Sequence, residues 1–493
     1  MSSTNKLGTE KEGDKKMQNI TKQKDDFSAW YQDVISVADL AEHSPVRGCM
    51  IIKPYGYSIW EKMQTTLDGT FKKRGVENAY FPIFIPENFL KREAEHVKGF
   101  SPELAVVTHG GGKKLDEPLI IRPTSETIIY ESFSRWIQSY RDLPLLINQW
   151  ANVVRWEMRP RLFLRTSEFL WQEGHTAHAT ADEAKDYALS ILDEVYKWFA
   201  EEILAIPVYT GVKSEAEKFA GAKQTFCIEA LMQDGKSLQM GTAHDLSDNF
   251  SRSFDVTFLD QSGERKHAYL SSWGVSTRMI GGLIMSHGDD KGLIIPPRIA
   301  PIHVVITPIM RTVEDEAVGE AHKLAKTLSE QFVVKVDDRM NLRAGEKFYE
   351  WEKKGVPVRI EIGPKDLKNQ SCVLVRRDTG EKQSVALTEV KKVVTDTLED
   401  IQSQLFQRAQ ERREQSNQKV NDWESFVAAI EQGGYVFAHW CEQNECEKNI
   451  KDKTKATTRC LPFEGEEEPG EHKCVLCGGK APNKKRWIFA RSY

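Results

Sequence analysis

The sequence predicts three folded units in succession: an α+β domain on an antiparallel sheet, an α/β domain, and a small zinc-containing C-terminal domain. Strand patterns separated by turn residues between positions 206 and 269 predict the antiparallel sheet. Strands and helices that alternate from Pro301 onward predict the α/β domain. Cysteines near the C-terminus, in a spacing typical of zinc ligands, predict the third unit. A chain of 493 residues is long enough for about two to four such cores.

Composition excludes several classes of protein. Residues 1–26 are almost all polar and lack the apolar stretch of a signal peptide, which predicts a disordered leader. No apolar run approaches the length of a membrane span, so we expect a cytoplasmic protein with no membrane contact. The net charge of −5 argues against a uniformly basic surface, so any contact with RNA is expected to be local.

The first unit mixes amphipathic helices with strands. The predicted helices cover residues 26–40, 57–73, 182–204 and 279–287, and the predicted strands cover residues 51–52, 79–86, 119–122, 206–211, 224–232, 237–250, 254–259 and 267–269. Pro82 interrupts strand 79–86, which indicates an edge or a bulge that can meet a partner chain. Thr124 is the expected N-cap of the helix that follows strand 119–122. We expect the strands after residue 205 to share one antiparallel sheet.

The second unit alternates regularly. Strands at 302–307, 332–336, 357–362 and 372–376 and helices at 312–330, 344–354 and 387–408 predict a parallel or mixed sheet. The charged, glutamine-rich pattern continues to residue 430 and indicates a connecting helical arm. A basic cluster is either a solvated strand end or a patch for an RNA backbone, and it comprises Arg359, Lys365, Lys368, Arg376 and Arg377.

The cysteines are concentrated at the end of the chain. Five of the eight lie in the last 53 residues, which indicates a metal rather than a disulfide framework. Four of them form two pairs, Cys441 with Cys446 and Cys474 with Cys477, and Gly-Gly follows the second pair. Four protein ligands leave no open position, so we expect a structural Zn²⁺ site. Cys460 is expected to be spare, and the weaker ligand candidates are His439 and His472.

Residues 153–175 predict a hairpin that carries several arginines around its turn. Arg155 and Glu157 share a face of the outgoing arm, where an arginine beside a carboxylate can bind an anionic group and a donor-rich group together. Phe169 and Trp171 share a face of the return arm and offer rings for stacking. A nucleotide site and a salt-bridged structural hairpin both fit this pattern.

Arg278 follows a glycine-containing strand and begins an apolar helix. At such a junction free backbone amides and an arginine lie close together, which favours a polyanion. An ordinary first turn of a helix is the alternative.

Together these segments resemble the class II aminoacyl-tRNA synthetases, and within them prolyl-tRNA synthetase of the archaeal and eukaryotic type. The resemblance runs from about Phe27 to Tyr493. Residues 75–86 resemble the dimer-forming first motif, VRWE with RTSEFLWQEGH the second, and WGVSTRMIGGLIMSHGD the third. The segments RPTSE, FLWQEGH and GTAHDL, with the zinc domain ending in Arg-Ser-Tyr, point to the prolyl enzymes. The stretch between the second and third motifs is too short for the editing insertion of the bacterial type.

The resemblance implies a nucleotide site. Arg155 would hold the α-phosphate and the substrate carboxylate, and Glu157 would take the adenine amino group. Phe169 would stack on adenine, with Arg278 on its other face or toward the γ-phosphate. The remaining implied ATP contacts are Arg165 at the β- and γ-phosphates and Gln239, Thr242 and His244 along the nucleotide side.

The resemblance also implies a proline pocket. Thr124 and Glu126 would accept hydrogen bonds from the imino nitrogen. The residues implied to shape the pocket around the ring are Trp171, Glu173, His175 and Phe100. Arg155, Glu157 and Arg278 are the implied catalytic residues, which act by positioning and charge neutralisation.

The implied activity is ATP-dependent attachment of L-proline to tRNA(Pro), in two steps through a prolyl-adenylate. ATP with Mg²⁺, L-proline and tRNA(Pro) would be its substrates, Zn²⁺ would be structural, and the protein would be a homodimer. The implied domains are a leader (1–26), a class II catalytic domain (27–298), an α/β anticodon-binding domain (299–408) and a C-terminal zinc-binding domain (409–493). The alternative is a non-catalytic, synthetase-derived protein that binds tRNA or a partner.

Overall fold

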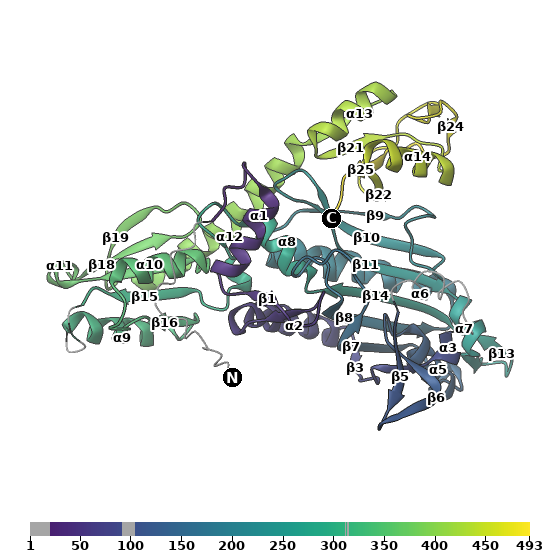
Figure 1. Ribbon diagram of the computed structural model, residues 1–493, viewed down its shortest axis with the longest axis horizontal. Helices are drawn as coiled ribbons and strands as arrows, with labels where there is room; N and C mark the ends of the chain where they lie inside the picture. The colour runs from purple at the N-terminus through teal and green to yellow at the C-terminus, as the bar shows by residue number, and fades with distance from the viewer. Residues whose placement is uncertain (1–19, 91–103, 311, 313–314) are drawn as a thin grey trace, which may run out of the picture.

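A computed structural model describes residues 20–90, 104–310, 312 and 315–493 (Figure 1). Its centre is an antiparallel array of six neighbouring strands, in the order β9-β10-β11-β14-β8-β7. These strands are β7 (Leu145–Val154), β8 (Glu168–His178), β9 (Val208–Val212), β10 (Gln224–Leu231), β11 (Ser237–Ser247) and β14 (Tyr269–Ser276). The antiparallel sheet predicted for the first unit is therefore confirmed.

Helices cover this array and bury its largest apolar core. That core brings together Trp30, Leu67, Tyr196, Met240 and Ile284 from four helical segments and the sheet. The helices are α1 (Phe27–Val37), α2 (Pro54–Lys73), α5 (Glu126–Trp136), α6 (Ala181–Ser190) with its π-helical continuations η3 (Ile191–Lys197) and η4 (Phe199–Ile203), α7 (Asn249–Phe254) and α8 (Arg278–His287). α2 begins earlier than predicted because Pro54 suits the first helical position.

The single strand predicted at 79–86 is wrong. The chain instead forms β3 (Glu77–Asn78), parallel to β7, and β4 (Phe84–Pro86), in a separate small sheet. Between them the Phe81 N–H donates to the side chain of Gln149 at 2.6 Å, and Pro82 has no N–H to offer a ladder. The small sheet has the order β4-β6-β5, and its other two strands are β5 (Ala105–Gly110) and β6 (Lys113–Ile121). The short helix α3 (Glu87–Leu90) directly follows β4.

Strands 254–259 and 267–269 were expected in the main sheet, and this is wrong except at Tyr269, the first residue of β14. β12 (Thr257–Leu259) and β13 (Arg265–His267) form a two-stranded sheet of their own, and Leu259 also makes an isolated bridge to Ser139. Helix α7 separates them from β11, and it ends at Asp255 in the left-handed conformation (φ 55°), which redirects the chain. A second two-stranded sheet joins β1 (Ala41–His43) to β2 (Met50–Ile52).

The α/β domain has a mixed sheet in the order β16-β15-β17-β18-β19, parallel over its first three strands. Its elements are β15 (Val304–Pro308), α9 (Glu316–Leu328), β16 (Val334–Val336), α10 (Ala344–Lys353), β17 (Val358–Ile362), α11 (Pro364–Lys368), β18 (Ser371–Arg376), β19 (Lys382–Ala386) and α12 (Val390–Gln415). Three arginines of the basic cluster form ion pairs inside the protein: Arg359 with Glu361, Arg376 with Asp378, and Arg377 with Asp289.

The helical arm predicted to residue 430 is interrupted. After α12 come β20 (Asn417–Lys419), α13 (Trp423–Gln432), β21 (Tyr435–Ala438), α14 (Asn444–Thr454), β22 (Thr457–Pro462), β23 (His472–Lys473), β24 (Lys480–Ala481) and β25 (Trp487–Ala490). β22 pairs with β9, through Leu461 opposite Val212 and Pro462 opposite Gly211. The C-terminal strands thus extend the central array into one eleven-stranded sheet.

Short 3₁₀ turns complete the fold, η2 (Tyr140–Asp142) and η5 (Pro297–Ile299). None of the helices within the described ranges combines the length and the apolar character needed to cross a bilayer.

Candidate active site

A cavity of about 260 Å³ opens over the central strands. The loop before α5, the strands β8, β11 and β14, and the start of α8 supply its walls. Most of the predicted site residues line it: Thr124, Glu126, Arg155, Phe169, Trp171, Glu173, His175, Gln239, Thr242, His244 and Arg278. Phe100 lies outside the described residues.

Strand β8 aligns four of these side chains. Phe169, Trp171, Glu173 and His175 alternate along it, so they share the face that lines the cavity. β8 lies between β7 and β14, and His175 stands between Ile147 and Ser272 in the register. The rings of Phe169 and Trp171 meet edge to face, with centroids 6.1 Å apart. The predicted pairing of these rings on one face is confirmed.

A buried hydrogen-bond network fixes Glu173. Its carboxylate accepts from the Ser125 hydroxyl, from Gln149 Nε2 at 2.8 Å and from His175 Nε2 at 3.1 Å. Burial by itself raises the pKa of Glu173. The hydrogen bond and charge of His175 and the bonds from Ser125 and Gln149 lower it by more, so the net pKa is below normal. The Tyr130 hydroxyl lies 3.1 Å from His175 Nδ1. Glu173 is therefore ionised, and its hydrogen bonds fix the floor of the cavity that it forms with His175.

The prediction that Thr124 caps α5 is wrong. The helix begins at Glu126 with Ser125 at the N-cap position, and no side chain bonds the first-turn amides there. Thr124 donates its hydroxyl proton to Glu126, and Ser125 donates to Glu173 instead. Both hydroxyls are buried and committed to carboxylates, so this turn serves the cavity rather than helix capping.

His244 is held neutral. Burial, and then the charges of His175 and Arg155, lower the pKa of His244 to about 3. Its Nδ1 lies 3.0 Å from the hydroxyl of Thr225, and its Nε2 lies 3.2 Å from that of Thr242. At neutral pH this ring offers hydrogen bonds but no positive charge.

Arginines line the outer half of the cavity. Arg155 donates from Nε to the Pro123 carbonyl at 2.9 Å, and its guanidinium lies 5.6 Å from the Phe169 ring centroid and 5.4 Å from that of Trp171. Burial, and then repulsion from Arg155 and Arg165, lowers the pKa of Arg278 to about 10. An anion placed among these groups would relieve that repulsion, so the region is built for a polyanion.

Glu157 and Arg165 lie in an adjoining hollow of about 150 Å³ that shares Arg155, Phe169 and Arg278 with the main cavity. They form an ion pair of 3.0 Å. The expectation that Arg155 and Glu157 lie on a strand is wrong, because β7 ends at Val154. The Glu157 N–H bonds the Ser167 hydroxyl, which replaces a strand ladder with a loop.

Sequence reasoning missed several residues of the site. Gln149 holds Glu173 from β7, and Trp273 of β14 lines the cavity beneath Gly174, where a Cβ would lie 2.0 Å from the indole ring. Glu217, Phe219 and Thr225 also line the cavity. Ser125 lies inside the RPTSE segment, so the sequence could have identified it as a site residue. The others are common residue types in ordinary strands and turns.

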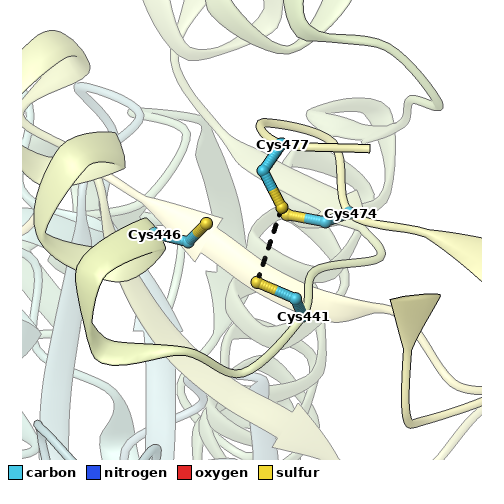
Figure 2. A group of neighbouring side chains, drawn as sticks. All are labelled: Cys441, Cys446, Cys474 and Cys477. Atoms are coloured by element: carbon cyan, nitrogen blue, oxygen red, sulfur yellow. Dashed lines mark hydrogen bonds between the residues drawn. The ribbon is translucent and has the colours of Figure 1, made fainter. Parts of the chain in front are cut away.

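The four predicted metal cysteines come together in the C-terminal domain (Figure 2). Their sulfur atoms all lie within 4.8 Å of one another, and Sγ of Cys477 is 3.8 Å from Sγ of Cys441. Sulfurs around a tetrahedral zinc with 2.3 Å bonds are separated by about 3.8 Å, so the cluster fits this ion. A hydrogen bond from the Gly479 amide lowers the pKa of Cys477, which favours the thiolate. Cys460 packs against Cys227 instead.

His439 and His472 form a separate group. Their rings stack with centroids 3.9 Å apart, and both contact Glu468, which also binds Arg486. Arg486 already neutralises the Glu468 carboxylate, so we interpret this group as a structural contact rather than a metal site.

Comparison with known proteins assigns these parts. Residues 109–287 match the tRNA synthetase class II core domain (G, H, P, S and T), residues 303–397 an anticodon binding domain, and residues 423–493 the prolyl-tRNA synthetase C-terminal domain. A protein of Porphyromonas gingivalis named proline–tRNA ligase is 53% identical over 496 residues, which cover 97% of this chain and 100% of the relative. The chain belongs to the proline–tRNA ligase family.

Other members of the family agree. Proline–tRNA ligase of Chloroherpeton thalassium is 53% identical over 483 residues, covering 97% of this chain and all of the relative. That of Natranaerobius thermophilus is 52% identical over 479 residues, covering 97% and 98%. These relatives are bacterial, so they lend no support to the finer expectation of an archaeal and eukaryotic type.

The proline–tRNA ligase family also accounts for the layout of the chain. The cavity residues from Thr124 to Arg278 fall inside the matched class II core, and the four clustered cysteines fall inside the matched C-terminal domain. The mixed sheet of the α/β domain falls inside the anticodon-binding match.

Proposed function

We propose that the protein attaches L-proline to tRNA(Pro) with the energy of ATP, in two steps through a prolyl-adenylate. One observation carries this proposal within the family: an arginine-lined outer cavity continues into a small, polar inner pocket over one sheet. The outer part suits a nucleotide polyphosphate, and the inner part suits a small amino acid. A binding protein freed from ATP chemistry has no need of this arrangement.

The nucleotide side consists of residues from the hairpin, β11 and α8. Arg155 holds the α-phosphate, Phe169 stacks on adenine and Glu157 accepts from its amino group. Arg165, whose side chain is 59% exposed, is free to turn from Glu157 toward the β- and γ-phosphates. The remaining contacts are Arg278, Gln239, Thr242 and the neutral His244.

The amino-acid side surrounds the buried network. Thr124 and Glu126 accept hydrogen bonds from the imino nitrogen of proline. Trp171, Glu173 and His175 shape the pocket around the ring, and Phe100 is proposed to join them. Contacts to the apolar ring of proline discriminate by only about 1–3 kcal/mol per methylene, so alanine and cysteine are the expected competitors.

The reaction needs no nucleophilic side chain. The proline carboxylate attacks the α-phosphorus in line, and pyrophosphate leaves as the phosphorus–oxygen bond to it breaks. ATP enters as its Mg²⁺ complex, so the metal belongs to the substrate. Arg155 and Arg278 neutralise the charge that develops on the phosphate oxygens. The 3′-terminal hydroxyl of tRNA then attacks the prolyl carbonyl and releases AMP.

Four thiolates, from Cys441, Cys446, Cys474 and Cys477, are proposed to hold a structural Zn²⁺. The ion would join the loop before α14 to the turn after β23. Cytoplasmic location, a homodimer, the archaeal and eukaryotic type, and the domain limits at residues 26, 298 and 408 stay predictions of the sequence.

Pyrophosphate exchange into ATP tests the function. We expect exchange that depends on L-proline, with alanine and cysteine as weak alternatives in a panel of amino acids. Folded protein that gives no proline-dependent exchange would overturn the proposal and favour the non-catalytic alternative.

A further inference from the structure

The segment between β9 and β10, residues 213–223, forms one wall of the cavity without regular secondary structure of its own. Glu217 and Phe219 from this segment line the cavity. A turn with few internal hydrogen bonds depends on its surroundings for its shape. Part of those surroundings is supplied by the C-terminal domain, which we call the tail (residues 423–493, the matched C-terminal domain).

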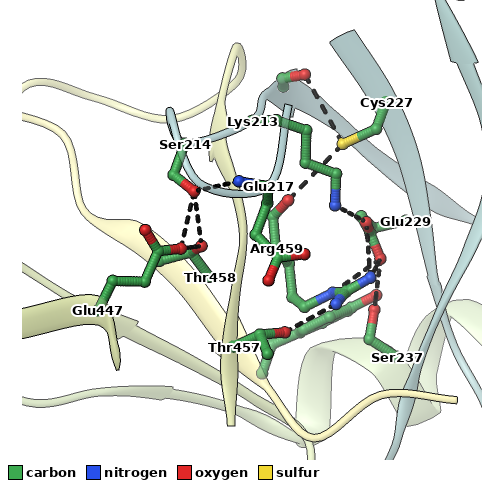
Figure 3. Close-up of polar contacts among 12 residues, drawn as sticks. Lys213, Ser214, Glu217, Cys227, Glu229, Ser237, Glu447, Thr457, Thr458 and Arg459 are labelled. Atoms are coloured by element: carbon green, nitrogen blue, oxygen red, sulfur yellow. Dashed lines mark hydrogen bonds and ion pairs between the residues drawn. The ribbon is translucent and has the colours of Figure 1, made fainter. Parts of the chain in front are cut away.

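Helix α14 of the tail holds the start of the segment (Figure 3). The Ser214 hydroxyl donates to Glu447 at 2.7 Å, and it lies 3.2 Å from the hydroxyl of Thr458 on β22. Thr458 donates to the same carboxylate oxygen of Glu447. All three side chains are buried. Ser214 in turn accepts from the Glu217 N–H at 3.3 Å, so the contact with α14 shapes the turn that carries Glu217.

One helical turn beyond Glu447, α14 makes a second contact. Lys451 lies on the same face, and its Nζ is 3.6 Å from the Glu217 carboxylate. Glu217 is 29% exposed and Lys451 is 58% exposed, so this pair lies at the rim. The tail therefore contacts both the backbone turn and the cavity-lining side chain.

A buried ionic group anchors the residue before Ser214. Lys213 Nζ lies 2.8 Å from Glu229 of β10, and Arg459 of β22 makes hydrogen bonds of 2.9 and 3.0 Å to the same carboxylate. Figure 3 shows this group beside the Ser214 contacts. Lys213 of the segment and Arg459 of the tail thus share the carboxylate of Glu229, next to the contact between Ser214 and Thr458.

The other end of the segment reaches the substrate side. The Phe219 N–H donates to the Thr225 hydroxyl at 2.9 Å, and that hydroxyl lies 3.0 Å from His244 Nδ1. The rings of Phe219 and His244 have centroids 4.7 Å apart. A continuous series of contacts therefore leads from α14 to His244, which is aligned across the sheet with Ser272 and with His175 of the amino-acid pocket.

We propose that the tail sets the affinity for proline, with Glu447 and Lys451 as positioning residues that hold Glu217 and Phe219 against the amino-acid pocket. This inference rests on the proposed function. A carboxylate and a phenyl ring suit the cationic imino group and apolar ring of proline, whereas a carboxylate repels the triphosphate of ATP. Misplacing the segment should therefore weaken proline binding more than ATP binding.

Steady-state pyrophosphate exchange with the full-length protein separates the two substrates. Lys451→Ala should raise the KM for proline about threefold, since the pair is partly exposed. Glu447→Leu should raise it about tenfold, because two buried hydroxyls lose their acceptor. The KM for ATP should stay within about twofold of normal in both variants. Glu447→Gln and Lys451→Arg keep the contacts and should restore the KM for proline.

Lys448→Ala is the matched control, because Lys448 is exposed on the same helix and forms no ion pair with any residue that the structure describes. It should leave both KM values unchanged. An unchanged KM for proline in folded Lys451→Ala and Glu447→Leu proteins would overturn the inference, as would equal increases for both substrates.

Hydrogen exchange measured by mass spectrometry gives a readout that does not depend on activity. Lys451→Ala and Glu447→Leu should speed exchange at residues 213–223, while Lys448→Ala should not. An unchanged rate of hydrogen exchange at residues 213–223 would refute the positioning role even if the enzyme proved to use another amino acid. If the wild-type protein showed no proline-dependent exchange of pyrophosphate into ATP, by contrast, only the proposed function would be refuted.

Discussion

Arg155 stands where the two halves of the cavity meet. It bonds the carbonyl of Pro123 just before the Thr124 turn, and its guanidinium lies near the rings of Phe169 and Trp171. A single residue with these neighbours can hold the reacting carboxylate and the α-phosphate together. Its planar, forked donor group suits that task, and a lysine ammonium does not reproduce it.

Arg155→Ala should reduce pyrophosphate exchange by at least about a hundredfold, which corresponds to about 3 kcal/mol of lost charge-assisted hydrogen bonding. Arg155→Lys should recover only part of this loss. Binding of tRNA, measured by filter retention, should change little in either variant. Near-normal exchange by the alanine variant would contradict the role of Arg155.

His287 makes the fold sensitive to acid. Burial lowers the pKa of His287 to about 3, and its Nε2 donates to the Leu204 carbonyl at 2.8 Å. The unfolded chain takes up a proton below pH of about 6.5 while the folded protein does not, so stability is complete above that pH and falls as the pH is lowered toward 3.

His287→Gln keeps a donor for Leu204. Between pH 6.5 and pH 5 this variant should lose about 2 kcal/mol less stability than the wild type. Urea unfolding at a series of pH values measures this difference. A variant that loses stability with pH as steeply as the wild type would show that another group dominates.

At the scale of single residues, the sequence allowed much of the site to be predicted. Alternation along β8 is a local property, and it was enough to place Phe169 and Trp171 on one face, while the family resemblance supplied Glu173 and His175. Strand pairing brings Gln149 to Glu173, and Glu217 belongs to an irregular segment that the tail contacts. No local pattern marks such residues.

Among the elements, α14 links the cluster of four cysteines to the catalytic domain. Cys446 lies in its first turn, and Glu447 and Lys451 follow on the helix. Loss of the ion should therefore loosen this helix before it alters the chemistry of the cavity.

Cys446→Ser and Cys477→Ser should each lower zinc content below one ion per chain and lower the melting temperature. Elemental analysis and calorimetry give the two values. Cys49→Ser is the control, because Cys49 lies outside the cluster and should leave the zinc content unchanged. Stoichiometric zinc in both cluster variants would refute this ligand set.

The elements that were predicted incorrectly share a cause. Residues 79–86 look like one apolar strand, but the chain divides there between two sheets because Phe81 bonds a side chain and Pro82 has no donor. Strands 254–259 and 267–269 have strand composition, yet α7 carries them away from the sheet. Apolar pattern predicts that a strand forms, and tertiary contacts decide what it pairs with.

At the scale of the whole molecule, a buried ionic group joins the tail to the catalytic domain. Glu229 is fully buried between Lys213 and Arg459. Burial by itself raises the pKa of Glu229, but the charges of Arg459 and Lys213 lower it below normal. The carboxylate is therefore ionised, and two buried cations depend on it.

Glu229→Gln should destabilise the protein by about 3–5 kcal/mol, because both cations would lose their counter-charge. Glu330→Gln, which removes an exposed pair with Lys391, should cost far less. Chemical unfolding compares the two variants. Equal effects would mean that the buried group contributes no more than a surface pair.

The pairing of β22 with β9 has a consequence for biosynthesis. A ribosome adding about 5–20 residues per second needs about ten to fifty seconds to go from Val212 to Thr457. During that interval the catalytic sheet has an uncovered edge at β9, whose free N–H and C=O groups can pair with another nascent chain. Production of this protein is therefore expected to be most vulnerable to aggregation late in translation, just before the last strands arrive.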